Sequence, residues 1–222
     1  MNCITASGIT DGDRAIGIGK DRDLIHRSGN PLTLNTVEDL LPRPLKNSGR
    51  FPPNVTHAVG VCAITLEAAG KMVGNGDPDS NVAVLASGFG PTLENNRKYF
   101  SDYVKAGRTM GRGNLFIYTL PTSAIAEVSI CFGFTGPTFF VESASHPAAE
   151  LMATATDLLS AREADEVITV WQDANTTWCA FMERTQTELC RPRLLEEIAS
   201  AAPAWKSPSE ALNHFTSWKT DQ

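Results

Sequence analysis

Between residues 81 and 173, apolar runs typical of strands alternate with apolar runs of helical spacing, and this order restricts the fold more than any other feature. NVAVLAS (81–87) is a continuous apolar run between turn signals, as expected for a buried strand. TGPTFFVES (135–143) and ADEVITVWQD (164–173) predict two further strands, separated by helices over 91–106, from Pro121 to Gly133, and over 146–162. Strands and helices that alternate with short connections predict a layered α/β domain around a buried, mixed central sheet.

The flanking regions are less regular. Residues 2–9 predict a strand and residues 54–73 a helix, whereas 11–50 is rich in Gly, Pro and Asp, with a short helix predicted at 35–41. After residue 174 the pattern weakens, apart from an amphipathic helix predicted from Arg191 to Ser200. We therefore predict a domain over 1–175, followed by a C-terminal extension over 176–222 that packs on it or is partly mobile.

The net charge and the cysteine content disfavour several classes of protein, namely those that bind nucleic acid, membranes or metal ions. The net charge of −6 and the absence of a Lys/Arg cluster disfavour nucleic acid and an anionic membrane surface. No apolar run approaches the ~20 residues of a membrane span, and no signal peptide is recognised at the N-terminus. The five cysteines are scattered without metal-ligand spacing, so we expect reduced thiols, a cytoplasmic location and no metal site.

Nucleotide and hydrolase motifs fail on their spacing. Gly17-x-Gly19-Lys20 is not a phosphate-binding loop, because the glycines are too close and Asp21 follows the lysine. Ser145 lacks the two glycines of a GxSxG nucleophile elbow. We expect no cofactor.

The segment from 116 to 171 contains an ordered set of features. A proline precedes a helix of small residues, and a Phe-Gly-x-x-Gly-Pro turn containing Gly133, Gly136 and Pro137 leads into a strand. That strand reaches an elbow of small residues at 143–145, a long helix follows, and an Ala-Asp pair opens the next strand. This set resembles the N-terminal half of the β-ketoacyl synthases, which have the thiolase-like fold, and weaker agreement extends over about 1–175.

The resemblance places the family's nucleophilic cysteine at position 145, where this chain has serine. A helix N-terminus promotes ionisation of a thiol, but a serine hydroxyl needs a nearby base. Ser145 therefore has two interpretations, an N-cap that bonds a backbone N–H or an acyl-accepting nucleophile. Ser143 belongs to the same elbow, whose small residues allow a tight bend from strand to helix.

The family's histidines and Gly-rich oxyanion loop come from a second half that these 222 residues do not reach. We therefore expect a chain that is not an independently active condensing enzyme, but a ketosynthase-like subunit of a fatty-acid or polyketide-type pathway. The alternative is a Ser145-dependent acyltransferase or thioester hydrolase that receives its base from a partner.

The resemblance also implies partners. The family strand that corresponds to 138–143 pairs across a dimer two-fold, which predicts a homodimer or a heterodimer with a full-length ketosynthase. Acyl carrier protein is a further partner, for which a basic patch is available in Arg97, Lys98, Lys105, Arg108 and Arg112. The aromatic residues Phe116, Phe139 and Phe140 are expected in the core, at an interface or in an acyl pocket.

Overall fold

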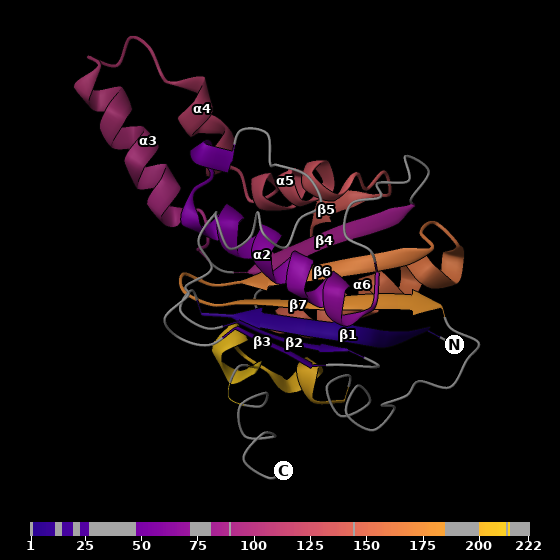
Figure 1. The fold of residues 1–222 in the computed structure, drawn as a ribbon. Helices are drawn as coiled ribbons and strands as arrows, with labels where there is room; N and C mark the ends of the chain where they lie inside the picture. The colour runs from indigo at the N-terminus through magenta and orange to yellow at the C-terminus, as the bar shows by residue number, and fades with distance from the viewer. Residues whose placement is uncertain are drawn as a thin grey trace.

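Seven strands of the described residues form one mixed sheet, shown in Figure 1. The structure is a computed structural model that describes residues 2–11, 15–19, 23–26, 48–71, 81–88, 90–143, 145–184, 200–211 and 213. In chain order the strands are β1 (Asn2–Thr10), β2 (Ala15–Gly19), β3 (Asp23–His26), β4 (Val82–Gly88), β5 (Thr138–Phe140), β6 (Glu166–Gln172) and β7 (Thr177–Arg184). Their order across the sheet is β3-β2-β1-β7-β6-β4-β5.

The sheet has a parallel part and an antiparallel part. β4 pairs in parallel with both β5 and β6, while β7, β1, β2 and β3 each run antiparallel to the preceding neighbour across the sheet. A parallel pair needs a crossover, and α6 (Pro147–Ala161) and α5 (Ser123–Phe132) lie in the connections along the parallel part. The sheet is therefore mixed, as the sequence predicts.

Helices cover both faces of the sheet. On one face α2 (Pro53–Ala68) and α5 pack over the strands, and on the other α6 packs together with residues 202–211 (Figure 1). Twelve of the sixteen residues of α2 are buried, and buried residues on every side are typical of a helix enclosed in a core. Residues Ala202, Trp205 and Ala211 join the α6 core, so part of the C-terminal extension packs on the domain.

A helical arm projects from this body. It comprises α3 (Leu93–Lys105), α4 (Gly113–Phe116) and the short helix η2 (Ile117–Thr119), and we call residues 93–119 the arm (Figure 1). No residue of α3 is buried. Inside the arm the rings of Tyr99 and Phe116 lie 5.5 Å apart. At its base Asn95 Nδ2 donates to Asn54 Oδ1 and to the Tyr118 carbonyl, both at 3.0 Å, which ties α3 to α2.

Two glycine-rich or weakly patterned regions form strands that the sequence did not predict. In β2, a Cβ on Gly19 would lie 1.7 Å from the carbonyl oxygen of Ala68, so glycine lets α2 pack directly on the strand. β7 lies between β1 and β6, and the boundary predicted after residue 175 therefore divides adjacent strands of the same sheet. Both strands depend on distant parts of the chain rather than on a local pattern.

The other predicted elements agree within a few residues. The predicted helices at 54–73, 91–106 and 146–162 correspond to α2, α3 and α6, and the strand at 135–143 shortens to β5. The helices predicted at 35–41 and 191–200 fall at least in large part outside the described residues. In the part of the chain that the structure describes, no single helix is long and apolar enough to cross a membrane, although α4 and η2 joined to α5 pass that test as a pair bent by 103°.

Candidate functional site

The site begins with the turn between α5 and β5. α5 ends at Gly133, whose φ of 73° lies in the left-handed region, and its N–H bonds to the Ser129 carbonyl. This is the usual C-terminal stop of a helix, because glycine adopts a positive φ without a side-chain penalty. Phe134 N also donates to the Ser129 carbonyl at 3.0 Å, which completes the turn. The helix stop predicted at Gly133 is thus present.

Gly136 allows β5 to pack close to β4. A Cβ at this position would lie 2.5 Å from the carbonyl carbon and oxygen of Val82 and 2.8 Å from Ala83 N. All three are backbone atoms, so a side chain would force the strands apart. The next residue, Pro137, accepts a hydrogen bond from Val84 N at 2.9 Å. The Gly136-Pro137 pair therefore fixes where β5 joins the sheet.

The elbow after β5 is built on Ser143 rather than on Ser145. The N-cap residue of α6 is His146, and its backbone N–H donates to Ser143 Oγ at 3.2 Å. Ser145 precedes the N-cap and is exposed. The interpretation of Ser145 as the N-cap is therefore wrong, and the reason is that the helix begins at Pro147, one residue later than that role requires.

Ser145 has no activating partner in the described structure. No hydrogen bond to its hydroxyl is found among the described residues, and the neighbouring His146 is exposed. A serine nucleophile needs a base within hydrogen-bond reach. Within the described residues, the elbow has a helix N-terminus and an exposed serine, but no base is hydrogen-bonded to the Ser145 hydroxyl.

The described thiols lie away from the elbow. Cys62 in α2 and Cys179 in β7 are fully buried, with their sulfur atoms 3.8 Å apart. Burial and the neighbouring Cys179 thiol raise the pKa of Cys62 well above its ordinary value. A buried thiol with a raised pKa is a poor nucleophile. Cys131, in α5, is half-buried and packs against the same core.

β5 leaves one edge of the sheet open among the described residues. Val84 N bonds to the Pro137 carbonyl and Val141 N to the Ala86 carbonyl, so alternate residues of β5 face β4. By the same alternation, the backbone N–H and C=O groups of Thr138 and Phe140 point away from the sheet. An exposed row of such groups can accept another strand.

The three predicted aromatic residues have different surroundings. Phe140 is half-buried against the core under α2 and α5, whereas Phe139, on the opposite face of β5, is 37% exposed. Phe116 is 49% exposed and lies in the arm against Tyr99. They do not converge on one cavity in the described structure. Exposed Ile130 of α5 adds to the apolar surface of the molecule, being 68% exposed.

A polar junction at the C-terminal ends of β4 and β6 had no recognisable sequence pattern. Gln172, at the end of β6, is buried and donates from Nε2 to the Asn54 carbonyl at 2.8 Å and to Thr177 Oγ1 at 3.0 Å. The neighbouring Ser87 hydroxyl is buried without a hydrogen-bond partner in the described structure. The Gln172 side chain therefore ties β6 to α2 and β7.

Three tryptophans among the described residues form an aromatic cluster. Trp178 packs edge-on against Trp171 and Trp205, with ring centroids 6.4 and 5.6 Å apart. No group of three His, Cys, Asp or Glu side chains among the described residues is arranged to hold a metal ion. The tryptophan cluster is therefore part of the α6 core.

Comparison with solved structures places this architecture. The ishigamide ketosynthase/chain length factor matches with a TM-score of 0.57 and 11% identity, over 84% of this chain and 63% of that chain. A β-ketoacyl synthase from Burkholderia phymatum matches with a TM-score of 0.57 and 12% identity, over 91% and 61%. A type II polyketide synthase acyl-carrier protein in complex with its ketosynthase gives a TM-score of 0.53 and 12% identity, over 83% and 63%.

No protein-family model matches the sequence, and no curated protein matches it. The chain shares the α/β fold of these ketosynthase structures, and it spans less than two thirds of the length of each of the three.

Proposed function

We propose that this chain is a non-catalytic, ketosynthase-like subunit of a fatty-acid or polyketide-type pathway that assembles through β5. The open edge of β5 supports this proposal most directly, because Thr138 and Phe140 direct backbone groups away from the sheet. An apolar strand at an open edge is prone to pair with another strand. Phe139, on β5 itself, is 37% exposed and supplies apolar area beside the strand edge.

The chemistry of the elbow supports a non-catalytic role. Ser145 replaces the cysteine that the family resemblance places there, and no base reaches its hydroxyl in the described structure. A helix N-terminus contributes only about 0.3–2 kcal/mol to an anion, which does not ionise a serine hydroxyl near neutral pH. Loss of a nucleophile or its base alone costs several orders of magnitude in rate.

The proposed partner is either a second copy of this chain or a full-length ketosynthase, with acyl carrier protein as a further partner. Light scattering of the purified chain, alone and mixed with a ketosynthase from its own pathway, tests the pairing. Thr138→Pro removes the outward N–H of Thr138 without removing a bond to β4, and we expect it to shift the assembly to monomer.

Thr138→Val is the matched control, because it keeps the backbone N–H and the β-branched shape. We expect Thr138→Val to assemble as the unaltered chain does. A monomer under both conditions for the unaltered chain would refute the pairing. Equal assembly of the proline and valine variants would show that β5 is not the contact.

The alternative function is a Ser145-dependent acyltransferase or thioester hydrolase. Two observations favour this alternative: Ser145 is exposed, and it lies just before the N-terminus of the 15-residue helix α6. Incubation with acyl thioesters followed by intact-mass measurement tests it. The alternative requires an acyl adduct that Ser145→Ala abolishes and Ser143→Ala retains. Equal turnover in Ser145→Ala would eliminate it.

A further inference from the structure

The projecting arm carries a row of exposed apolar side chains along α3. Leu93, Phe100 and Val104 are 51%, 61% and 40% exposed, and the second and third follow the first by seven and eleven residues. Each residue of an α-helix turns by about 100°, so the three side chains lie within about 40° of one another around the axis. We call these three residues the arm stripe, which no part of the described structure buries.

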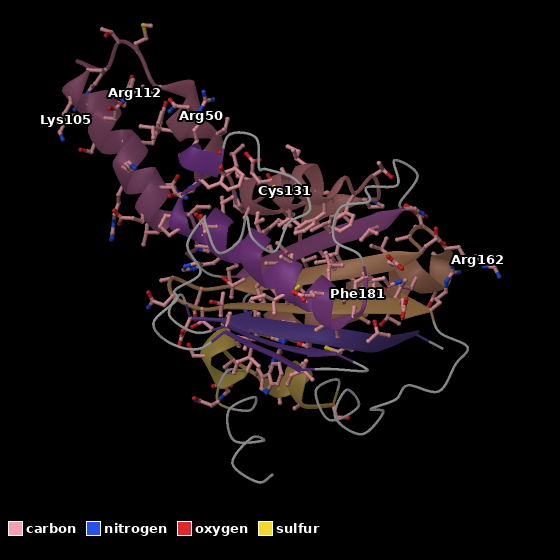
Figure 2. All side chains as sticks on the ribbon, in the orientation of Figure 1. Arg50, Lys105, Arg112, Cys131, Arg162 and Phe181 are labelled. Carbon is pink, nitrogen blue, oxygen red and sulfur yellow. The ribbon has the colours of Figure 1, made fainter. Side chains whose placement is uncertain are left out.

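The tip of the arm also presents an apolar side chain to solvent. The connection between α3 and α4 contains Met110, which at 77% has the highest exposure of the exposed large hydrophobic residues in the described structure. Arg108 and Arg112 lie two residues before and after it. Figure 2 shows Lys105 and Arg112 on the arm, away from the sheet and its cores. Met110 therefore adds nothing to the core and is available to an apolar environment outside the chain.

The charge of the arm is opposite to that of the whole chain. Residues 93–119 contain five Lys or Arg and two Asp or Glu, so the arm carries +3 in a chain of net charge −6. Both carboxylates lie near arginines of the arm, at 2.8 and 3.9 Å. The other cations, Lys98, Lys105 and Arg108, are exposed and form no ion pair with any described residue. The argument from net charge against an anionic surface thus does not apply to the arm.

The projection of the arm separates these cations from the negative body. α3 has 13 residues and is about 20 Å long, whereas charges in physiological salt are screened over about 8 Å. Its inner end is tied to α2 through Asn95, and Lys105 lies at its outer end (Figure 1). An anionic surface can therefore reach the outer part of the arm without strong repulsion from the rest of the chain.

The positions of the cations around α3 fit a lipid surface. By the helical rotation, Lys98 and Lys105 lie about 120–140° from the arm stripe, on one flank of the helix. A lysine has a long apolar stem, so its ammonium group can reach lipid phosphates while the stripe lies deeper. An amphipathic helix with apolar residues on one side and cations on the polar side is typical of helices that lie in a membrane interface.

We propose that the arm binds the surface of an anionic lipid bilayer, with the arm stripe and Met110 at the acyl boundary and Lys98, Lys105 and Arg108 at the lipid phosphates. This contact goes beyond the proposed function and does not depend on it. A bilayer accounts for both the charge and the exposed apolar side chains. An acidic protein surface would account for the cations and leave Phe100 and Met110 unexplained.

The test measures co-sedimentation of the full chain with vesicles of phosphatidylcholine, alone or mixed with phosphatidylglycerol, at several salt concentrations. We expect binding to the mixed vesicles, weaker at higher salt, and little binding to phosphatidylcholine alone. Each cation near an anionic surface contributes about fivefold, so Lys98→Gln/Lys105→Gln should weaken binding about 20-fold. The charge-matched control is Arg162→Gln/Lys206→Gln, at two exposed positions outside the arm, and it should bind as the unaltered chain does.

A second double variant tests insertion separately from charge. Phe100→Gln/Val104→Gln leaves the net charge unchanged, and glutamine suits an exposed helix, so circular dichroism should show an intact fold. We expect this variant to bind the mixed vesicles at least about tenfold more weakly, also at low salt, because less apolar area enters the bilayer.

Several results would overturn the membrane contact while leaving the proposed function intact. The first is that the unaltered chain does not bind the mixed vesicles. The second is that either double variant of the arm binds them as tightly as the unaltered chain. Without vesicle binding, light scattering that shows self-association lost in Phe100→Gln/Val104→Gln would assign the stripe to a second copy. Likewise, lysine-dependent binding of an acidic protein without vesicle binding would assign the cations to that protein.

Discussion

Replacing Gly136 by alanine tests whether the close approach of β5 to β4 positions the proposed contact strand. The added Cβ would lie 2.5 Å from backbone atoms of Val82, where ordinary contacts begin near 3.4 Å. Overpacking of this kind costs about 1–3 kcal/mol, and weakening of the bond from Val84 N to the Pro137 carbonyl adds about 0.5–1.5 kcal/mol. We therefore expect the free energy of unfolding to fall by about 2–4 kcal/mol.

Urea denaturation and thermal unfolding at fixed protein concentration measure this loss, because any self-association makes stability depend on concentration. For a chain of this length the expected loss lowers Tm by about 4–15 °C. Gly113→Ala is the matched control, since no atom lies within 4 Å of its Cβ position and it begins a helix. We expect Gly113→Ala to be neutral or to stabilise by up to about 1 kcal/mol.

The reasoning fails if Gly136→Ala unfolds within about 0.5 kcal/mol of the unaltered chain, the usual range for surface substitutions. The same result would remove the link between this glycine and β5 pairing. A destabilised Gly136→Ala that still assembles normally would separate the two roles, and would show that β5 keeps its edge geometry despite the clash.

Two further substitutions test polar contacts around the sheet. Burial alone would lower the pKa of Lys71, but its bonds to Glu166 and Glu183 outweigh burial and raise it, so Lys71→Met should reduce the free energy of unfolding by about 1–2 kcal/mol. Glu166 and Glu183 face each other across β6 and β7, so their carboxylates repel each other once the Lys71 charge is removed. Adding Glu183→Gln to Lys71→Met should therefore restore about half of the lost free energy of unfolding, as measured by urea denaturation. No recovery in the double variant would contradict this repulsion between the two carboxylates. Burial, reinforced by the charge of Glu127, raises the pKa of Tyr118 to about 12. As the pH rises, the Tyr118 hydroxyl therefore loses its proton in the unfolded chain before it does so in the folded chain. The free energy of unfolding should then fall by up to about 1 kcal/mol between pH 10 and pH 12. If Tyr118→Phe has the same ultraviolet titration curve as the unaltered chain, the raised pKa of Tyr118 is contradicted.

The local turns were predictable because their causes are local. Gly133 ends α5 through its own backbone conformation, and Gly136-Pro137 follows within one short turn. The strand β7 was not predictable in this way. Both of its faces are buried, so its sequence lacks alternation, and one of its two neighbours is β1, which is distant in sequence.

The candidate site likewise has some features that the sequence shows and others that depend on the folded structure. The serine at position 145 was visible in the sequence, and the family resemblance supplied the expectation of a cysteine there. The role of Ser143 in the elbow depends on where α6 begins, and only the structure shows that His146 is the N-cap residue. Likewise, the basic residues of the arm were visible, but the pairing of Arg112 with Asp102 required both helices in place.

The alternation of strands and helices and the turn into β5 were readable from the sequence, because each depends on residues close together in the chain. The place of β7 in the centre of the sheet and, among the described residues, the open outer edge of β5 became visible only in the folded chain. These features depend on which distant segments meet. Contacts between distant segments are determined by the packing of side chains and by the need of buried backbone N–H and C=O groups for hydrogen bonds. A local sequence pattern does not encode them.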